Sequence, residues 1–312
     1  MRPFPLPKFW TLLAAASLAC QAGETEVAEE AMEPAGAPAA GSVEVVADDY
    51  SFLAPDTIPS GWTTFRMVNQ GNEPHFFLLN RLPEGKTFED YGREVAAPFD
   101  SVWNALASGA VDKAEAGAML GRLLPAWYAG VEAMGGVGLL AAGRTAQATA
   151  RLEPGSYVME CYVKTAEGSF HAMLGMVTPI TVSTEVSDQE APAPDLRVTL
   201  TNAELAVEGE PSAGEQTVAV HFEEHPEVGL GNDVHLVRLD GTSIEEIVPW
   251  MDWMNVDGLR APAPALFLGG TQEMPVGETA YFQATLEPGR YAWISETAAE
   301  RLVQEFSIDS IQ

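Results

Sequence analysis

The sequence predicts a mainly β protein of two tandem β-sandwiches, the first of which carries a helical insertion. Short β-branched and aromatic runs, such as 63–69 and 156–163, lie between Gly, Pro and Asn residues, which is typical of strands joined by turns. The segment LEPGSY at Leu152–Tyr157 is repeated as LEPGRY at Leu286–Tyr291, which indicates that a whole domain is duplicated. A Pro-rich, acidic break at 186–195 (VSDQEAPAPD) lies between the two copies.

The composition predicts folded cores and excludes several functions. Of the 312 residues, 46% are apolar, which is enough to build sizeable cores. The 16 Lys and Arg residues face 45 Asp and Glu residues, which gives a formal net charge of -29. A chain this acidic repels phosphate groups, so nucleic-acid binding and a basic membrane patch are excluded. The two cysteines, Cys20 and Cys161, are too few for a disulfide-rich scaffold or a four-cysteine zinc site.

Residues 1–20 predict export from the cell. Arg2 and Lys8 precede the apolar stretch Phe9–Ala19, which is too short to span a membrane as a helix but suits a signal peptide. The stretch ends at Cys20 and resembles a bacterial lipoprotein signal, in which the cysteine at the cleavage site is lipidated. The resemblance implies a membrane anchor at Cys20 and an extracytoplasmic location, either periplasmic or at the cell surface. An ordinary secretory signal with a nearby cysteine is the alternative.

Shifts in composition divide the rest of the chain. Residues 21–41 are rich in Ala, Glu, Gly and Pro and lack apolar periodicity, which predicts a flexible acidic tether. The predicted domains span 42–184 and 196–312, and a linker at 185–195 joins them.

Each half is predicted to carry an insertion between its first His-containing strand and its LEPG segment. In the first half the insertion spans about 86–140, with helical patterns over 87–96, 100–107 and 112–134. The Gly-rich run Met134–Gly138 (MGGVG) is interpreted as a loop. In the second half a shorter helical stretch covers Ser243–Asn255.

Three segments of the first half resemble the cupredoxin family of blue copper proteins, over residues 42–184. Asn69–His75 (NQGNEPH) resembles the family's N-x-G-x-x-P-H segment, whose His is a copper ligand. Tyr157–Cys161 (YVMEC) resembles the strand that ends in the thiolate ligand. His171–Met176 (HAMLGM) supplies a His and, after four residues, a Met. The nine residues between Cys161 and His171 are more than familiar members of the family have.

The resemblance implies Greek-key sandwiches with one type 1-like copper ion in the first domain. His75, Cys161 and His171 would be the strong ligands and Met176 the axial ligand, with Met173 as a substitute on the same loop. Two imidazoles, one thiolate and a weak thioether form the blue-copper ligand set, which suits both oxidation states of copper. The implied role is one-electron transfer with a redox partner protein at the cell envelope, rather than enzymatic catalysis. A metal-free sandwich is the alternative.

The second half lacks this ligand set. In the alignment of the repeats Cys161 falls on Ser295, and no His or Met follows Ser295. Only His235 remains, at the place of His75. A hydroxyl is a poor copper ligand, so the second domain is predicted to be a degenerate copy that serves packing or partner binding. The chain has no His-x-His motif, which excludes a multicopper oxidase.

Two other segments contain residues that can bind metals. In a strand, the two histidines of His221–His225 (HFEEH) would lie ~13 Å apart, too far to hold one ion. Trp250–Met254 (WMDWM) offers soft thioethers, but such a stretch more often packs a short helix onto a sandwich. Nucleotide-binding and hydrolase motifs are missing. The alternatives to electron transfer are therefore a metal-free module that recognises a protein or small ligand through the helical insertion, and copper storage or delivery.

Overall fold

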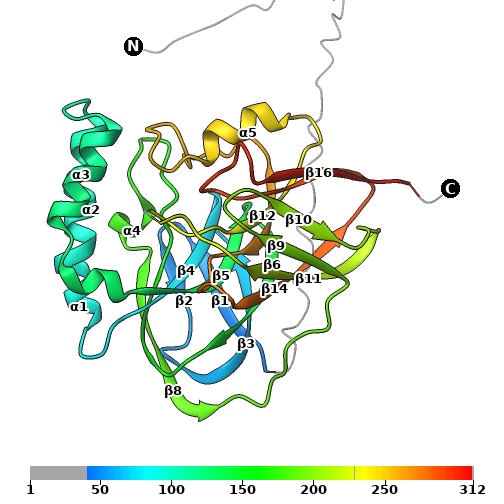
Figure 1. Cartoon of the computed structure of the whole chain (residues 1–312), viewed down its shortest axis with the longest axis horizontal. Coiled ribbons are helices and arrows are strands. Elements are labelled where there is room, and N and C mark those ends of the chain that lie inside the picture. The colour runs from blue at the N-terminus through cyan, green and yellow to red at the C-terminus, as the bar shows by residue number, and fades with distance from the viewer. Residues whose placement is uncertain (1–40, 228, 311–312) are drawn as a thin grey trace, which may run out of the picture. The chain divides into compact units, whose positions relative to one another are not determined.

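Two β-sheets packed face to face form the body of the molecule in a computed structural model, which describes residues 41–227 and 229–310 (Figure 1). One continuous hydrophobic core, which includes Phe65, Leu79 and Phe282, contains buried side chains from both sheets. The predicted mainly β sandwich with a helical segment is thereby confirmed. The predictions of a signal peptide, of lipidation at Cys20 and of a tether fall on residues 1–40, outside the described ranges.

Within the described ranges, eight strands lie in each half of the chain. Those of the first half are β1 (Val43–Asp48), β2 (Ser51–Leu53), β3 (Thr57–Asn69), β4 (His75–Arg81), β5 (Glu132–Leu140), β6 (Thr145–Leu152), β7 (Gly155–Glu160) and β8 (Val177–Val186). Those of the second half are β9 (Leu196–Leu200), β10 (Leu205–Glu208), β11 (Gly214–Phe222), β12 (Val234–Arg238), β13 (Leu266–Thr271), β14 (Thr279–Leu286), β15 (Gly289–Ile294) and β16 (Val303–Ile308).

The long strand β3 links the two sheets. The first sheet has the order β10-β9-β11-β14-β6-β3, with β1 parallel to β3 and β2 paired with β1. The second has the order β8-β7-β4-β5-β13-β12-β15-β16. Residues 57–60 of β3 pair with β8, whereas residues 61–68 pair with β6. Gly61 lies where the pairing changes and has a φ of 93°, which glycine adopts readily.

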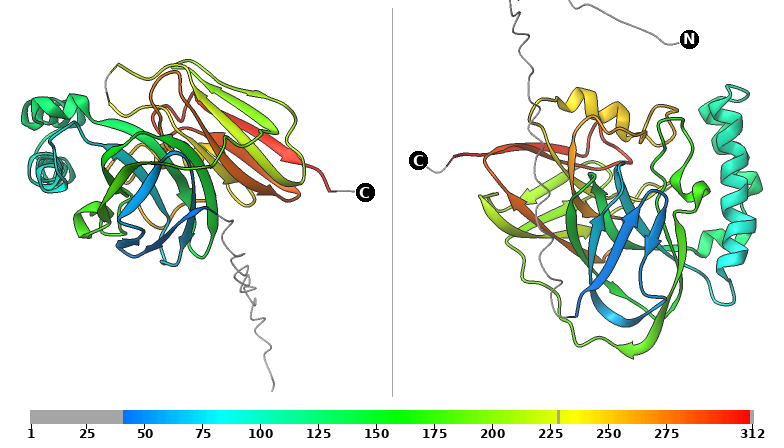
Figure 2. Two further views of the ribbon diagram at one scale, coloured as in Figure 1. Left: turned by 90° about the horizontal axis from the view of Figure 1, so that it is seen from below. Right: turned by 180° about the vertical axis from the view of Figure 1, so that it is seen from behind.

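Both sheets continue from the first half of the chain into the second (Figure 2). Strand β6 pairs antiparallel with β14, and β5 pairs antiparallel with β13. The halves therefore share hydrogen-bonded sheets in addition to the connecting residues between Val186 and Leu196.

A helical segment between β4 and β5 packs beside the sandwich (Figure 1). It consists of α1 (Phe88–Tyr91), the π-helix η1 (Gly92–Ala96), α2 (Ala97–Ala107), α3 (Lys113–Leu123) and the 3-10 helix η2 (Ala126–Gly130). Thr87 begins α1 with a capping box, and the side chain of Asp112 caps α3. Two further helices are α4 (His171–Leu174) and α5 (Ile244–Met251). Within the described ranges, every helix is too short or too polar to cross a membrane.

The helical segment ends earlier than the sequence predicts. Strand β5 begins at Glu132, so the predictions of a helix to residue 134 and of a loop over Met134–Gly138 are wrong. Glycines suit this strand because its neighbours approach closely. A Cβ on Gly136 would collide with the carbonyl oxygen of Phe77. Three of the five residues in Met134–Gly138 are glycines, so this segment shows no alternation of apolar and polar side chains that would indicate a strand.

The two LEPG segments carry the chain from one sheet to the other, so each is a turn between the sheets and not a hairpin within one sheet. Strands β6 and β14 lie in the first sheet, whereas β7 and β15 lie in the second. In each copy the Tyr hydroxyl donates to the backbone carbonyl four residues earlier, at 2.6 Å from Tyr157 to Glu153 and 2.9 Å from Tyr291 to Glu287. This corner motif explains why the tyrosine belongs to the repeat.

Candidate metal centre

Three of the four residues that the resemblance implies as ligands meet in the core of the first half. His75 is the first residue of β4, Cys161 directly follows the neighbouring strand β7, and His171 begins α4. Their side chains are fully buried, and their ligand atoms lie within 4.8 Å of one another. Nδ1 of His171 is 3.1 Å from Nδ1 of His75 and 3.7 Å from Sγ of Cys161.

The long segment between Cys161 and His171 folds back on itself. Lys164 forms an antiparallel bridge with Phe170. The amide of His171 donates to the carbonyl of Val163 at 2.8 Å, and the amide of Ala172 donates to that of Cys161 at 2.8 Å. These hydrogen bonds return His171 to Cys161, so the length of the segment does not separate the two side chains.

Carboxylates fix the orientation of both imidazole rings. Nε2 of His75 lies 2.9 Å from Oδ1 of Asp49, and Nε2 of His171 lies 2.8 Å from Oε2 of Glu73. An ionised carboxylate only accepts hydrogen bonds, so each Nε2 carries the ring proton and donates it. Each Nδ1 then presents a bare lone pair to the other ring. Carboxylates that hold the outer nitrogen of a ligating His are common around protein metal sites.

The two facing lone pairs require a proton or a cation between them. Burial, and then the neighbouring His75, lowers the pKa of His171 to about 3, so a proton is disfavoured at neutral pH. Burial also lowers the pKa of His75, although Asp49 opposes the shift. Both imidazoles are therefore in the neutral form that ligates metals. The pair fits a soft or borderline cation better than it fits a proton.

Cys161 completes the soft side of this cluster. Burial raises the pKa of its thiol to about 12, while backbone hydrogen bonds from Phe76 and Val163 favour the thiolate. A thiolate in this buried position needs a positive charge beside it, which a bound metal ion would supply. The donor set of two imidazoles and one thiolate fits copper.

The two methionines of the loop lie in different surroundings. Met176 is fully buried in the same core cluster as Cys161. Its carbonyl accepts from the amide of Cys161 at 3.1 Å, and its amide donates to the carbonyl of His171 at 3.0 Å. Met173 packs instead with Trp103 and Phe170. This difference favours Met176 over Met173 as the fourth ligand.

Sequence reasoning missed the residues that support the histidines. Asp49 precedes the family-like segments, and Glu73 is one of many acidic residues, so neither stood out. Hydrogen bonds from Asn72 and His75 outweigh the effect of burial and lower the pKa of Asp49. Gly71 carries the clearest signal: a Cβ there would collide with the Asp49 carboxylate and would lie 2.8 Å from Nε2 of His75.

The equivalent position in the second half holds a different cluster. His235, Asp233 and Glu296 are buried, with ligand-type atoms within 4.8 Å of one another. Ser295, at the place of Cys161, donates its hydroxyl to Oδ1 of Asp233 at 2.9 Å. Sequence analysis missed the two acids, which are marked only by their closeness to His235 and Ser295.

Both ring nitrogens of His235 are already engaged. The amide of Leu139 donates to Nδ1 at 3.0 Å, so Nδ1 carries no proton, and Nε2 donates to Oδ2 of Asp233 at 2.8 Å. A metal at either nitrogen would displace one of these buried hydrogen bonds. Burial, and then Asp233, raises the pKa of Glu296 well above its usual range. This cluster therefore suits a bound proton better than a metal ion.

The other histidines form separate contacts. Nδ1 of His221 lies 3.1 Å from the hydroxyl of Thr279, and Nε2 of His225 donates to the carbonyl of Met274 at 2.6 Å. Neither belongs to a metal-type cluster of the described residues. In the Met/Trp stretch, Trp250 and Met251 are buried in the main core, as the packing interpretation predicts.

No protein-family model and no curated protein matches the chain. Among solved structures it is similar to auracyanin B, at 22% identity over 46% of this chain and 89% of that one, with a TM-score of 0.27. It is also similar to dithionite-reduced auracyanin from Roseiflexus castenholzii, at 21% identity over 47% of this chain and 99% of that one, with a TM-score of 0.28. A multicopper oxidase matches 85% of this chain and 88% of its own length, at 14% identity and a TM-score of 0.24.

Proposed function

We propose that the chain binds one copper ion through His75, Cys161 and His171, with Met176 as the axial ligand, and transfers single electrons. One observation carries the proposal: two buried imidazoles, each held by a carboxylate at Nε2, turn bare Nδ1 atoms toward each other beside a buried thiol. When bound, copper supplies a one-electron couple that this donor set accommodates in both states.

The protein's own part in electron transfer is to keep the ligands still. Asp49 and Glu73 fix the rings, and the backbone bonds among Cys161, His171 and Met176 hold the loop. Full burial of the three strong ligands excludes water from them. A site that moves little when an electron arrives loses little energy to rearrangement. We propose electron transfer rather than catalysis for this reason.

The proposal also includes a location for the protein in the cell. A redox partner protein would meet it at the cell envelope, with the chain exported and anchored through a lipid on Cys20. Nucleic acid is not a partner, because the net charge is -29. The intact mass of the protein extracted from membranes tests the anchor. We expect a lipid-modified N-terminus that is lost in Cys20→Ser, and an unmodified wild-type chain would contradict it.

Copper titration of the whole metal-free chain, followed by visible absorption, tests the site. We expect one equivalent of Cu(II) to give an intense band at about 600 nm, from charge transfer between thiolate and copper. Cys161→Ser should abolish the band. The matched pair Met176→Leu and Met173→Leu tests the axial ligand, because only Met176→Leu should change the reduction potential. Absence of both the band and retained copper would overturn the proposal and favour a metal-free binding module.

Copper storage or delivery is the other candidate function, since the same ligands can hold Cu(I). The two roles differ in whether the protein retains or releases its copper ion. An electron carrier cycles between Cu(I) and Cu(II) without losing metal, whereas a delivery protein releases Cu(I) to a chelator. We expect repeated cycles of oxidation and reduction to leave copper content unchanged, and loss of copper at each reduction would favour delivery.

A further inference from the structure

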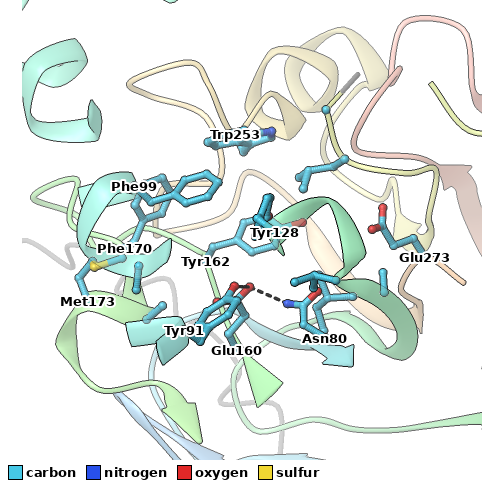
Figure 3. A pocket seen from close by; sticks show the side chains of 17 residues that line it. Asn80, Tyr91, Phe99, Tyr128, Glu160, Tyr162, Phe170, Met173, Trp253 and Glu273 are labelled. Carbon is cyan, nitrogen blue, oxygen red and sulfur yellow. Dashed lines mark hydrogen bonds between the residues drawn. The ribbon is translucent and has the colours of Figure 1, made fainter. Parts of the chain in front are cut away.

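A cavity of about 200 Å³ lies between the helical segment, the second sheet and the residues that follow α5 (Figure 3). Six aromatic side chains line it: Tyr91, Phe99, Tyr128, Tyr162, Phe170 and Trp253. The ring of Trp253 lies 6.3 Å from that of Phe99 and 6.4 Å from that of Phe170. Ligand sites for drug-sized molecules are commonly ~300–1,000 Å³, so this cavity suits a smaller molecule.

Two acidic side chains line the cavity. They are Glu160 and Glu273, and no Lys, Arg or His is among the described lining residues. Oε1 of Glu160 accepts hydrogen bonds from Asn80 at 2.8 Å and from the Tyr91 hydroxyl at 2.9 Å. Both bonds go to the same oxygen. Burial raises the pKa of Glu160 and of Glu273 to about 7, and a cation in the cavity would favour the charged form of both. Glu160 comes from the first half of the chain and Glu273 from the second.

The lining selects among possible occupants by charge. An anion would be repelled by both carboxylates. A neutral aromatic molecule would pack on the rings but would offer no positive charge to the two acidic groups. A cation is attracted both by the carboxylates and by the negative faces of the aromatic rings. Ammonium groups whose hydrogens are replaced by methyl groups suit such rings because they have little water to lose.

The basic side chain of Lys164, which lies near the cavity, already has hydrogen-bond partners. Nζ of Lys164 donates to the carbonyls of Trp253 at 2.8 Å and Asn255 at 2.7 Å. It lies 4.3 Å from the ring centre of Trp103, and it is not among the residues that line the cavity. The cavity is therefore not filled by this side chain.

We propose that this cavity binds a small organic cation of the quaternary ammonium class. Trp253, Phe99 and Phe170 would contact the methylated ammonium group, and Glu160 and Glu273 would balance its charge. The site lies beside the metal ligands but faces away from them, because Glu160 and Tyr162 flank Cys161 and side chains alternate along an extended chain. Binding is consequently separable from copper binding.

Isothermal titration of the whole metal-free chain with choline tests the proposal. We expect one saturable site. The neutral isostere 3,3-dimethylbutanol, which has the same shape without the charge, should bind at least about tenfold more weakly. Because copper is absent from this experiment, its result does not depend on the proposed electron transfer. Failure to saturate with choline, or equal affinity for the neutral isostere, would overturn the proposal.

Two pairs of variants locate the site. Trp253→Ala should weaken choline binding about tenfold or more, whereas Trp62→Ala, at a ring that packs on Tyr281 in the first sheet, should leave it unchanged. Glu273→Gln should also weaken binding, while the exposed Glu300→Gln should not. Circular dichroism shows whether each variant is folded. Unchanged affinity in both folded cavity variants would place any choline site elsewhere and contradict the proposal.

Discussion

His75 and His235 occupy equivalent places in the two halves, yet their surroundings differ in one decisive respect. Nδ1 of His75 faces another bare nitrogen, that of His171, whereas Nδ1 of His235 accepts a hydrogen bond from the amide of Leu139. In the first half a sulfur lies beside the pair, and in the second the hydroxyl of Ser295 takes the place of that sulfur.

A buried histidine becomes a candidate ligand through the partner of its other ring nitrogen. Where a carboxylate holds Nε2 and nothing donates to Nδ1, the ring offers a lone pair. Where the backbone donates to Nδ1, the same ring becomes part of a hydrogen-bond network. Burial and residue type alone are the same in both halves and do not separate the two cases.

Exchanging Cys161 and Ser295 between the two halves should have the largest effect on copper binding. We expect Cys161→Ser to lose copper binding and the visible band entirely. Ser295→Cys should not gain a second copper, because both nitrogens of His235 remain engaged. Copper content of the purified variants, measured by atomic absorption, checks both. Two equivalents of copper in Ser295→Cys would refute the role assigned to the Leu139 amide.

Weakening the carboxylates should have the next largest effect. Asp49→Asn and Glu73→Gln remove the negative charge that holds each Nε2 proton, and we expect copper affinity to fall about 10- to 100-fold in each. Competition with a chelator measures the affinity. Asp56→Asn is the matched control, since Asp56 is exposed and its substitution removes the same charge away from the two rings. Equal losses at Asp56 and Asp49 would mean that net charge, rather than ring orientation, sets the affinity.

Much of the sandwich could be predicted because its signals are local. Turn residues, β-branched runs and the LEPG repeat each depend on a few neighbouring residues, as does the motif that ends in His75. Strand β5 could not be predicted, since its glycines have no side chains and reflect close contacts with Phe77 and the second half. Asp49 and Glu73 were missed for a related reason: their roles arise only when distant segments meet.

The cluster of Asp233, His235 and Glu296 should affect how stability depends on pH, rather than bind a metal ion. Burial raises the pKa of Glu296 above the unfolded value of about 4.5, so the folded chain holds this proton more tightly. Its contribution to stability is fully present below that value and is lost as pH rises through the folded pKa. Glu296→Gln should therefore gain stability relative to wild type as pH rises. Urea unfolding at several pH values checks this, with Glu300→Gln as the control, and a parallel pH profile would contradict it.

Removing the hydroxyl of either corner tyrosine, Tyr157 or Tyr291, should have the smallest effect, a modest loss in the free energy of unfolding. Tyr157→Phe and Tyr291→Phe each remove one hydroxyl that donates to a Glu carbonyl in the turn between the sheets. A hydrogen bond of this kind contributes about 0.5–1.5 kcal/mol, so we expect a loss of that size in each variant. Urea unfolding measures both. Because the sheets run through both halves, the two variants should unfold in a single transition. A separate early transition in either one would show that this half unfolds on its own.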